Sequence, residues 1–365
     1  MTRPTWAEVD LDAIRHNARV LTERAAPATL CAVVKADGYG HGAVAVARAA
    51  LEGGATWLAV ALVEEGVALR DQGITAPILL LSEPPDVGGA VAAGLTPTVY
   101  TGAGVVAAGD VPVHLKVDTG MHRVCADPAT AAQLARTIPH LEGVWTHFAV
   151  ADQVDDPFTD EQAERFDTLL AELAAAGIHP AQRHACNSAG VLGHPQWHYD
   201  MVRCGIALYG VAPSPAMAEL ARHLRPALSL KAEVSYVKEV EAGEGVSYGL
   251  RYRLPERSTI ATVPTGYADG VPWRLGVTGG EVLIGGFRRP IAGAVTMDQI
   301  TVDCGDDRSV RPGDEVVLIG RQGDEHIGAH EWAERVGTIA YEVLTGIGPR
   351  VPREYSAWFS APLGP

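Results

Sequence analysis

Residues 30–62 read LCAVVKADGYGHGAVAVARAALEGGATWLAVAL and contain one strand–helix–strand repeat. An apolar run at 30–35 is followed by a glycine-rich turn, an alanine-rich helical segment at 43–51 and a second apolar run at 57–62. Short apolar runs are typical of strands buried on both faces, and a helix between two such runs predicts that they pair in parallel. The stretch therefore predicts one βα repeat of a parallel sheet.

The same alternation continues to about residue 204. Six further apolar runs follow, at 77–81, 96–100, 113–117, 141–147, 182–186 and 201–204. A helical segment is predicted at 63–71 and another at 160–176, where Thr159 and Gln162 form a capping-box pattern and Gly177 marks the end. Eight repeats in roughly 200 residues indicate a closed (βα)8 barrel of the TIM type. An open doubly wound sheet is the alternative, but no GxGxxG sequence follows the first strand.

From about residue 226 the pattern changes. Shorter apolar runs, separated by turns rich in Gly and Asp, lie at 228–240, 258–264, 281–284, 300–304 and 315–319. Alternating runs of this kind are typical of strands that bury one face. We therefore expect an α/β protein with a (βα)8 barrel in residues 1–226 and a mainly β domain in residues 227–365. The first residues are also able to pack on the β domain.

Composition excludes several classes of function. The chain has 365 residues, a formal net charge of −15 and 47% hydrophobic residues. That hydrophobic content argues against disorder, and the acidic balance argues against a general nucleic-acid binder. The most apolar stretch, at 57–63, is too short to cross a bilayer, which takes about 20 residues.

The cysteines and the N-terminus predict the compartment. The chain has five scattered cysteines and no CxxC pair, namely Cys31, Cys125, Cys186, Cys204 and Cys304. An odd, scattered set argues against a disulfide framework and a zinc site. The first twelve residues carry acids and lack the apolar segment of a signal peptide. We expect a cytoplasmic protein with no metal and no membrane partner.

The chemistry of a parallel barrel is expected at the carboxyl ends of its strands. Lys35 follows the buried strand residues 32–34. Burial lowers the pKa of a lysine and frees its amine for Schiff-base chemistry. A lysine that snorkels to the barrel rim is equally consistent with this position.

Two strand ends carry a predicted phosphate site. Asn187 and Ser188 follow the seventh strand, and Gly205 and Ile206 follow the eighth. Loops at these two strands bind phosphate in many barrels of this kind, although Ser188 alone is more typical of a helix N-cap. A reactive lysine and a phosphate site at one barrel mouth suggest pyridoxal 5'-phosphate (PLP).

Further motifs make the chain resemble the bacterial alanine racemases nearly from end to end. Residues 32–42, AVVKADGYGHG, are similar to the PLP-binding sequence of that family. Similar sequences follow in the family's order at 116–123, 146–149, 183–188, 201–206, 246–249, 266–270, 297–299 and 341–342. The resemblance implies a PLP-dependent isomerase that interconverts L- and D-alanine and supplies D-alanine for peptidoglycan. It also implies a homodimer with shared active sites.

The resemblance implies two bases on opposite faces of the substrate. Lys35 would hold PLP and act on one face, and Tyr248 from the partner subunit's β domain would act on the other. A solvent-facing tyrosine at a turn is the alternative for Tyr248. Arg203 would face the pyridine nitrogen, with His184 behind it. Because an arginine does not give up its proton, it leaves that nitrogen unprotonated, which disfavours side reactions.

The remaining implied roles are supporting ones. Arg123 would bind the PLP phenolate oxygen and the substrate carboxylate, and Lys116 corresponds to a position that is often carbamylated in the family. An unmodified lysine is the alternative for Lys116, and a core-edge histidine is the alternative for His184. The other implied cofactor contacts are His147 on the ring and a phosphate group formed by Tyr39, Asn187, Ser188, Gly205, Ile206 and Tyr341. The partner subunit would supply Met297, Tyr267 and Asp298 near the substrate, and dimer packing is the alternative for the first two.

Other functions stay open. A broader small amino-acid racemase acting on serine, or a racemase that confers cycloserine resistance, fits the same sequence. A PLP decarboxylase of similar architecture would place an acid opposite the pyridine nitrogen and a cysteine as the partner's catalytic group, and Arg203 and Tyr248 argue against it. A PLP carrier protein built from one barrel would lack the β domain.

Overall fold

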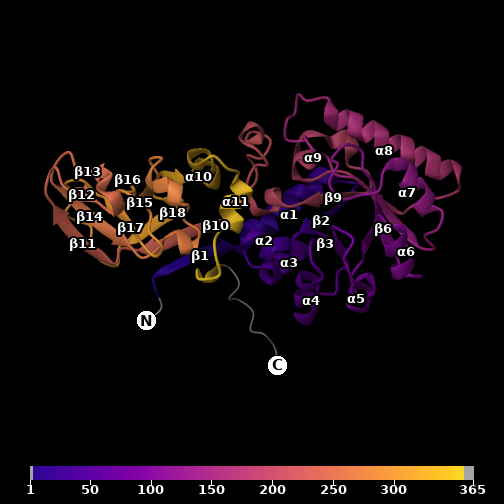
Figure 1. Cartoon of the computed structure of the whole chain (residues 1–365), viewed down its shortest axis with the longest axis horizontal. Coiled ribbons are helices and arrows are strands. Elements are labelled where there is room, and N and C mark those ends of the chain that lie inside the picture. The colour runs from indigo at the N-terminus through magenta and orange to yellow at the C-terminus, as the bar shows by residue number, and fades with distance from the viewer. Residues whose placement is uncertain (1–2, 357–365) are drawn as a thin grey trace. The chain divides into compact units, whose positions relative to one another are not determined.

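The computed structural model describes residues 3–356, which divide into two compact units (Figure 1). One unit spans Asp12–Pro226. The other combines the start of the chain, up to Leu11, with the chain from Ala227 onward. None of the helices in the described part of the chain is long and apolar enough to cross a membrane.

The first unit contains eight parallel strands, which are β2 (Thr29–Val33), β3 (Trp57–Val60), β4 (Ile78–Leu80), β5 (Thr98–Val99), β6 (Val113–Lys116), β7 (Leu141–Trp145), β8 (Gln182–His184) and β9 (Met201–Cys204). They pair as two arcs, β9–β2–β3–β4 and β5–β6–β7–β8. Backbone hydrogen bonds join the arcs: Leu80 donates to Thr96 (2.9 Å) and Arg203 donates to Cys186 (3.0 Å). The strands therefore close into a barrel in sequence order, as predicted.

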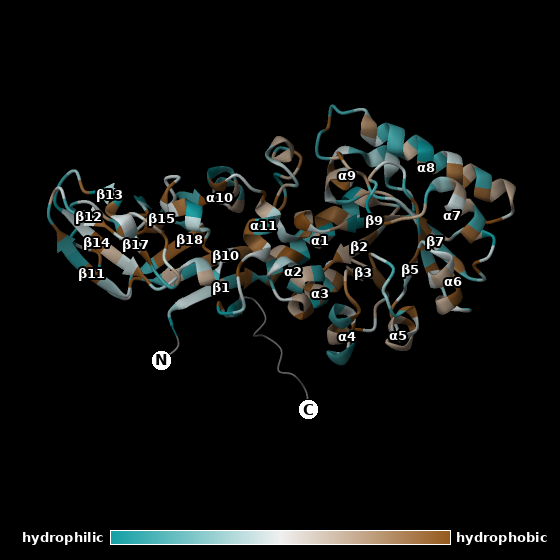
Figure 2. Cartoon of the chain, viewed as in Figure 1, coloured by the Kyte–Doolittle hydropathy of each residue, from teal (hydrophilic) through white to brown (hydrophobic). Residues whose placement is uncertain are grey.

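Helices follow the strands around the barrel. They are α1 (Leu11–Ala25), α2 (Lys35–Tyr39), α3 (Ala43–Glu52), α4 (Val63–Asp71), α5 (Val87–Ala92), α6 (Gly102–Ala108), α7 (Pro128–Ala135), α8 (Phe158–Ala175) and α9 (Ser188–Gly193). Short 3-10 turns lie at η1 (Pro195–Trp197), η2 (Ile206–Tyr209) and η3 (Pro215–Met217). Hydrophobic and hydrophilic residues alternate along α8 in Figure 2, as expected for a helix that covers a barrel with one face.

The start of α8 differs from the prediction. The helix begins at Phe158, and its N-cap, Pro157, makes no side-chain cap. Thr159 is buried, and its hydroxyl caps nothing. Gln162 serves the loop after β7 instead, because it accepts from the Ala149 N–H (2.8 Å) and donates to the His147 carbonyl (3.1 Å). The predicted capping box is therefore wrong.

The second unit is mainly β. Its strands are β1 (Thr5–Asp10), β10 (Leu228–Glu233), β11 (Tyr236–Val240), β12 (Gly245–Val246), β13 (Tyr252–Arg253), β14 (Ser258–Val263), β15 (Glu281–Ile284), β16 (Phe287–Pro290), β17 (Ile300–Asp303), β18 (Glu315–Gln322), β19 (Glu325–Ile327) and β20 (Arg353–Ser356). The largest sheet has the order β16–β15–β18–β10–β1–β20, so the first strand of the chain belongs to this unit. A second sheet has the order β11–β14–β17. A barrel followed by a mainly β unit confirms the predicted fold class.

Two predictions for this unit need correction. The run at 228–240 is two strands, because Val234 donates to Asp314 and the next residue, Ser235, donates to Thr262. The chain therefore crosses from one sheet to the other between β10 and β11. The unit also contains two short helices that the apolar pattern missed, α10 (Ala329–Val336) and α11 (Ala340–Thr345). The remaining turns are η4 (Tyr248–Leu250), η5 (Tyr267–Asp269) and η6 (Trp273–Gly276).

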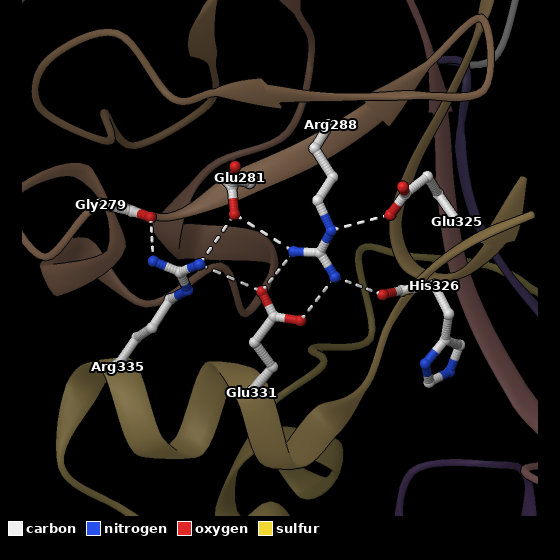
Figure 3. A network of polar contacts seen from close by, with 7 residues as sticks. All are labelled: Gly279, Glu281, Arg288, Glu325, His326, Glu331 and Arg335. Carbon is white, nitrogen blue, oxygen red and sulfur yellow. Dashed lines mark hydrogen bonds and ion pairs between the residues drawn. The ribbon is translucent and has the colours of Figure 1, made fainter.

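A charged network connects α10 to the large sheet (Figure 3). The guanidinium of Arg288 on β16 contacts Glu281 (3.1 Å), Glu325 (2.9 Å) and Glu331 (2.8 Å). Arg335 bridges Glu281 (2.8 Å) and Glu331 (3.2 Å). Because one arginine lies among three carboxylates, its removal would leave like charges close together.

We expect Arg288→Met to lower the free energy of unfolding by about 1–2 kcal/mol at neutral pH, since it breaks a hydrogen-bonded network. Hydrogen bonding to Arg288 lowers the pKa of Glu331. Stability from that pairing is present above the ordinary glutamate pKa of about 4.3 and is lost as the pH falls through the lowered pKa. Thermal unfolding should therefore separate variant and native protein at pH 7 and bring them together in acid. The exposed Arg321→Met is the control; a variant as stable as this control at pH 7 would contradict the prediction.

Candidate active site

Lys35 lies at the barrel mouth, two residues after β2 ends at Val33. Its side chain is half-buried. Burial lowers the pKa of Lys35, the charge of Arg123 lowers it further, and the charge of Glu65 opposes them. The amine is therefore more often neutral, and more reactive, than that of a lysine in water.

The turn after Lys35 has a left-handed backbone. Ala36, Asp37, Gly38 and Tyr39 all have positive φ, of 52°, 50°, 61° and 53°. This turn buries the ring of Tyr39 against Tyr209, with a centroid distance of 4.8 Å. Burial raises the pKa of Tyr39 to about 12, so its phenol stays protonated at neutral pH.

Arg203 on β9 is the most buried cation of the site, with 2% of its surface exposed. Its guanidinium donates to His184 Nδ1 (2.7 Å), to the carbonyls of Thr146 (2.8 Å) and Ala185 (2.9 Å), and to His147 Nδ1 (3.2 Å). Burial lowers the pKa of Arg203 to about 10, which keeps it charged at neutral pH. The side chain is therefore a fixed positive group on the inner wall of the barrel.

A second histidine, which sequence reasoning missed, extends this contact. Because Arg203 donates to His184 Nδ1, the proton of His184 lies on Nε2, which donates to Nδ1 of His114 (2.8 Å). His114 Nε2 faces the Glu142 carboxylate at 3.7 Å. Burial lowers the pKa of both histidines, so both are neutral. The signal for His114 was its place two residues before Lys116, on the same face of one strand.

Lys116, at the end of β6, is 4% exposed. Its Nζ donates to the Leu81 carbonyl (3.2 Å) and lies 4.4 Å from the ring centroid of Trp145. Burial lowers the pKa of Lys116 to about 8, and the charges of Arg203, Arg123 and Lys35 act in the same direction. Burial and the same charged groups hold the pKa of His147 well below its usual range. The structure thus brings four cations and a neutral histidine together at the barrel mouth.

Ser188 lies beside the loop that follows β9. Asn187 is the N-cap of α9, since its side chain accepts from Gly190 (3.0 Å), so the N-cap interpretation of Ser188 is wrong. Ser188 Oγ instead accepts the backbone N–H groups of Gly205 (3.0 Å) and Ala207 (3.2 Å). Both lone pairs of this oxygen are then used, and its hydroxyl proton is left to donate.

These residues fit PLP. A reactive amine, a hydroxyl donor beside a backbone loop, and a buried guanidinium match the aldehyde, phosphate and pyridine nitrogen of that molecule. The loop at Gly205 also has no space for a side chain, because a Cβ there would lie 2.3 Å from Tyr39 Oη. Ile206, which begins η2, is fully buried beside it.

The other predicted residues belong to the β unit. Tyr248, Tyr267, Met297 and Asp298 line one cavity of about 760 Å³, together with Trp273 and others that sequence reasoning missed. Tyr248 is 77% exposed in the single chain, and Asp298 is paired with Arg350 (2.7 Å). Tyr341 lies on α11 in the same unit and is half-buried.

Comparison with known proteins identifies the family. The family described as "Alanine racemase, N-terminal domain" matches residues 9–213, and "Alanine racemase, C-terminal domain" matches residues 227–355. The chain belongs to the alanine racemase family. The resemblance found from the sequence is thereby confirmed.

Similar members of the alanine racemase family are known as sequences and as structures. The alanine racemase of Symbiobacterium thermophilum is 51% identical over 97% of both chains. That of Carboxydothermus hydrogenoformans is 46% identical over 97% of this chain and all of the relative. Among solved structures, the alanine racemase of D-cycloserine-producing Streptomyces lavendulae superposes with a TM-score of 0.91 at 40% identity over 97% of both chains. The alanine racemase of Bacillus anthracis with bound L-Ala-P has a TM-score of 0.91 at 41% identity, over 97% of this chain and 95% of that one.

Proposed function

We propose that this chain is a PLP-dependent alanine racemase that interconverts L- and D-alanine. The observation that carries the proposal is the cationic barrel mouth of Lys35, Lys116, Arg123 and Arg203, in a chain that matches the family over both units. Bound PLP supplies the electron withdrawal that makes the α-hydrogen of an amino acid acidic. The protein's own residues must bind it, orient the substrate and move the proton.

Lys35 would hold PLP through its ε-amine and would be the base on one face of the substrate. Its free amine would remove or return a proton at the substrate's Cα. The lowered pKa of Lys35 supports this role, because a general base works best with a pKa near the operating pH. Ser188, Gly205, Ile206, Asn187 and Tyr39 would hold the phosphate, and the family resemblance adds Tyr341.

Tyr248 of the partner subunit is the base on the opposite face. Inversion at Cα requires one group to remove the proton and another to return a proton from the far side. The exposed hydroxyl-bearing side chain of Tyr248, at a cavity lined by Tyr267, Met297 and Asp298, supports a role toward a second copy of the chain. The active enzyme is therefore a homodimer in this proposal.

Arg203 limits the chemistry to racemisation. Arg203 stays charged and is held by its hydrogen bond to His184, so it would be a permanent donor toward the pyridine nitrogen of PLP and would leave that nitrogen unprotonated, with weaker electron withdrawal. His147 would pack on the PLP ring. Weaker electron withdrawal by the PLP ring would disfavour decarboxylation and amino-group transfer.

Lys116 is carbamylated in this proposal. Its neutral amine attacks CO2, a C–N bond forms, and one proton leaves to solvent. A pKa of about 8 supports this step, because only the neutral amine reacts. The resulting carboxylate would orient Arg123 toward the substrate carboxylate.

The substrate range tests the assignment. We expect racemisation of alanine to be fastest, serine to react measurably, and leucine to react slowest. One extra methylene in a pocket changes transition-state binding by about 1–3 kcal/mol, so selectivity for the small side chain is real but soft. Chiral chromatography of each amino acid after incubation with the PLP-loaded protein measures the rates. Equal rates for all three would contradict the alanine assignment.

The cellular setting follows from the proposed reaction. The product, D-alanine, is available for peptidoglycan. All five cysteines are free thiols, and four are buried, which supports a reducing, cytoplasmic location.

A further inference from the structure

Three backbone N–H groups point at one carboxylate beside the barrel mouth. Oε1 of Glu65 accepts from Ala36 (2.6 Å), and Oε2 accepts from Ala61 (2.8 Å) and Leu62 (3.1 Å). Ala36 directly follows Lys35 after β2, whereas the other two donors follow β3. A single side chain therefore links the ends of two neighbouring barrel strands.

The role of Glu65 at the start of α4 explains only part of these three hydrogen bonds. Glu65 is the third residue of α4, and a glutamate there commonly reaches back to the N-cap N–H, here that of Leu62. The bond to Ala36 is different, because that residue belongs to the preceding βα loop and lies 29 positions away. Glu64, the neighbouring acid on α4, is exposed. The helix does not need the Ala36 contact.

The contact is made where the backbone is strained. Ala36, Asp37 and Tyr39 occupy the left-handed region, which costs about 1–2 kcal/mol for each residue with a side chain. Such a conformation persists only if its surroundings impose it. Glu65 holds the start of the turn through Ala36, and the Asp37 carboxylate holds its end by accepting from Ala43 (2.9 Å).

The same carboxylate acts electrostatically on Lys35. Arg123 and burial favour the neutral amine, and the charge of Glu65 favours the protonated one. Lys116 and Arg203 also lie near the mouth and add positive charge there. The negative charge of Glu65 therefore partly offsets the positive charge of this cluster.

We propose that Glu65 is a positioning residue of the active site, whose carboxylate holds the peptide after Lys35 in its left-handed turn and so aims the Lys35 amine. This inference rests on the proposed role of Lys35 as the PLP-bearing residue. Loss of the Glu65 carboxylate should slow attachment of PLP and lower kcat more than it raises KM.

Two variants separate geometry from charge. Glu65→Ala removes both oxygens, whereas Glu65→Gln keeps one acceptor oxygen and removes the charge. Glu64→Ala and Glu64→Gln are the matched controls on the same helix. Circular dichroism verifies that each variant is folded, and the Gln variant remains informative if the Ala variant does not fold.

The measurements use the apoprotein as well as the loaded enzyme. The chain has only four lysines, Lys35, Lys116, Lys231 and Lys238, so mass spectrometry of peptides resolves each one. Competitive acetylation at a series of pH values reports the pKa of Lys35, and borohydride trapping after PLP is added reports how fast PLP reaches that amine.

We expect trapping at Lys35 and kcat to fall about tenfold or more in Glu65→Ala, because a displacement of about 1 Å costs up to about 100-fold. In Glu65→Gln the pKa of Lys35 should fall, since the charge that raises it is gone. Trapping rates and kcat within about twofold of the native protein in both Glu65 variants would overturn the proposal. A native protein that traps no PLP at Lys35 would instead contradict the proposed function, so the two failures are distinguishable.

Discussion

Lys35→Ala is expected to abolish racemisation, with a loss of at least about 10⁴-fold, the upper end of what one general acid–base residue contributes. In the proposed function, the variant removes both the attachment point of PLP and the base on one face of the substrate. Burial and the nearby Arg123 lower the pKa of this amine, which suits it to both roles. Lys231 and Lys238 belong to the β unit and not to the barrel mouth. The measurement is the rate of D-alanine formation from L-alanine by the variant supplied with excess PLP.

The visible absorbance of the purified protein provides a second readout. The native protein should show the band of PLP bound to a lysine, borohydride should remove it, and Lys35→Ala should lack it. Lys238→Ala, which changes an exposed lysine on β11, is the control and should keep both the band and the activity. Full activity in Lys35→Ala would show that another group performs the chemistry.

Tyr248→Phe should have the second largest effect, lowering racemisation by about 10²–10⁴-fold. The substitution removes one hydroxyl from a side chain that is 77% exposed in the single chain, so the fold should not change. If Lys35 and Tyr248 act on opposite faces, loss of one base need not stop proton removal by the other. In this proposal Lys35 acts on D-alanine and Tyr248 acts on L-alanine. Exchange of the α-hydrogen with deuterium should therefore survive better from D-alanine than from L-alanine.

Mass spectrometry of each enantiomer after incubation in D2O measures this asymmetry. Tyr236→Phe is the control, because Tyr236 is also exposed, at 59%, and lies on β11 away from the residues that line the cavity. Equal loss of exchange from both enantiomers in Tyr248→Phe would remove the two-base assignment.

The barrel could be predicted from the sequence because most of its strands are short apolar runs; β8 (Gln182–His184) is the polar exception. The pattern defines the ends of the strands less closely. The run at 96–100 keeps only Thr98–Val99 as a strand, since Pro97 has no N–H to donate to a neighbour. The single run at 228–240 became two strands because backbone bonds to different sheets are invisible in an apolar pattern.

The candidate site also contains residues that the sequence predicts and contacts that only the fold reveals. Lys116 is the last residue of β6, and Lys35 and Ser188 lie two and four residues after β2 and β8. The rule that chemistry lies at strand ends therefore finds them without a structure. The contact between His114 and His184 joins residues 70 positions apart and depends on the barrel's closure. Glu65 was hidden because its pattern is that of an ordinary helix start, and only the folded loops bring Ala36 to it.

The most direct test of the central claim is to incubate the PLP-loaded protein with L-alanine in D2O and to follow both enantiomers. The two enantiomers have equal free energy in water, so a racemase must end at equal amounts from either starting side. We predict that D-alanine accumulates to half of the total and carries deuterium at Cα. Formation of no D-alanine by protein that has taken up PLP would contradict the account.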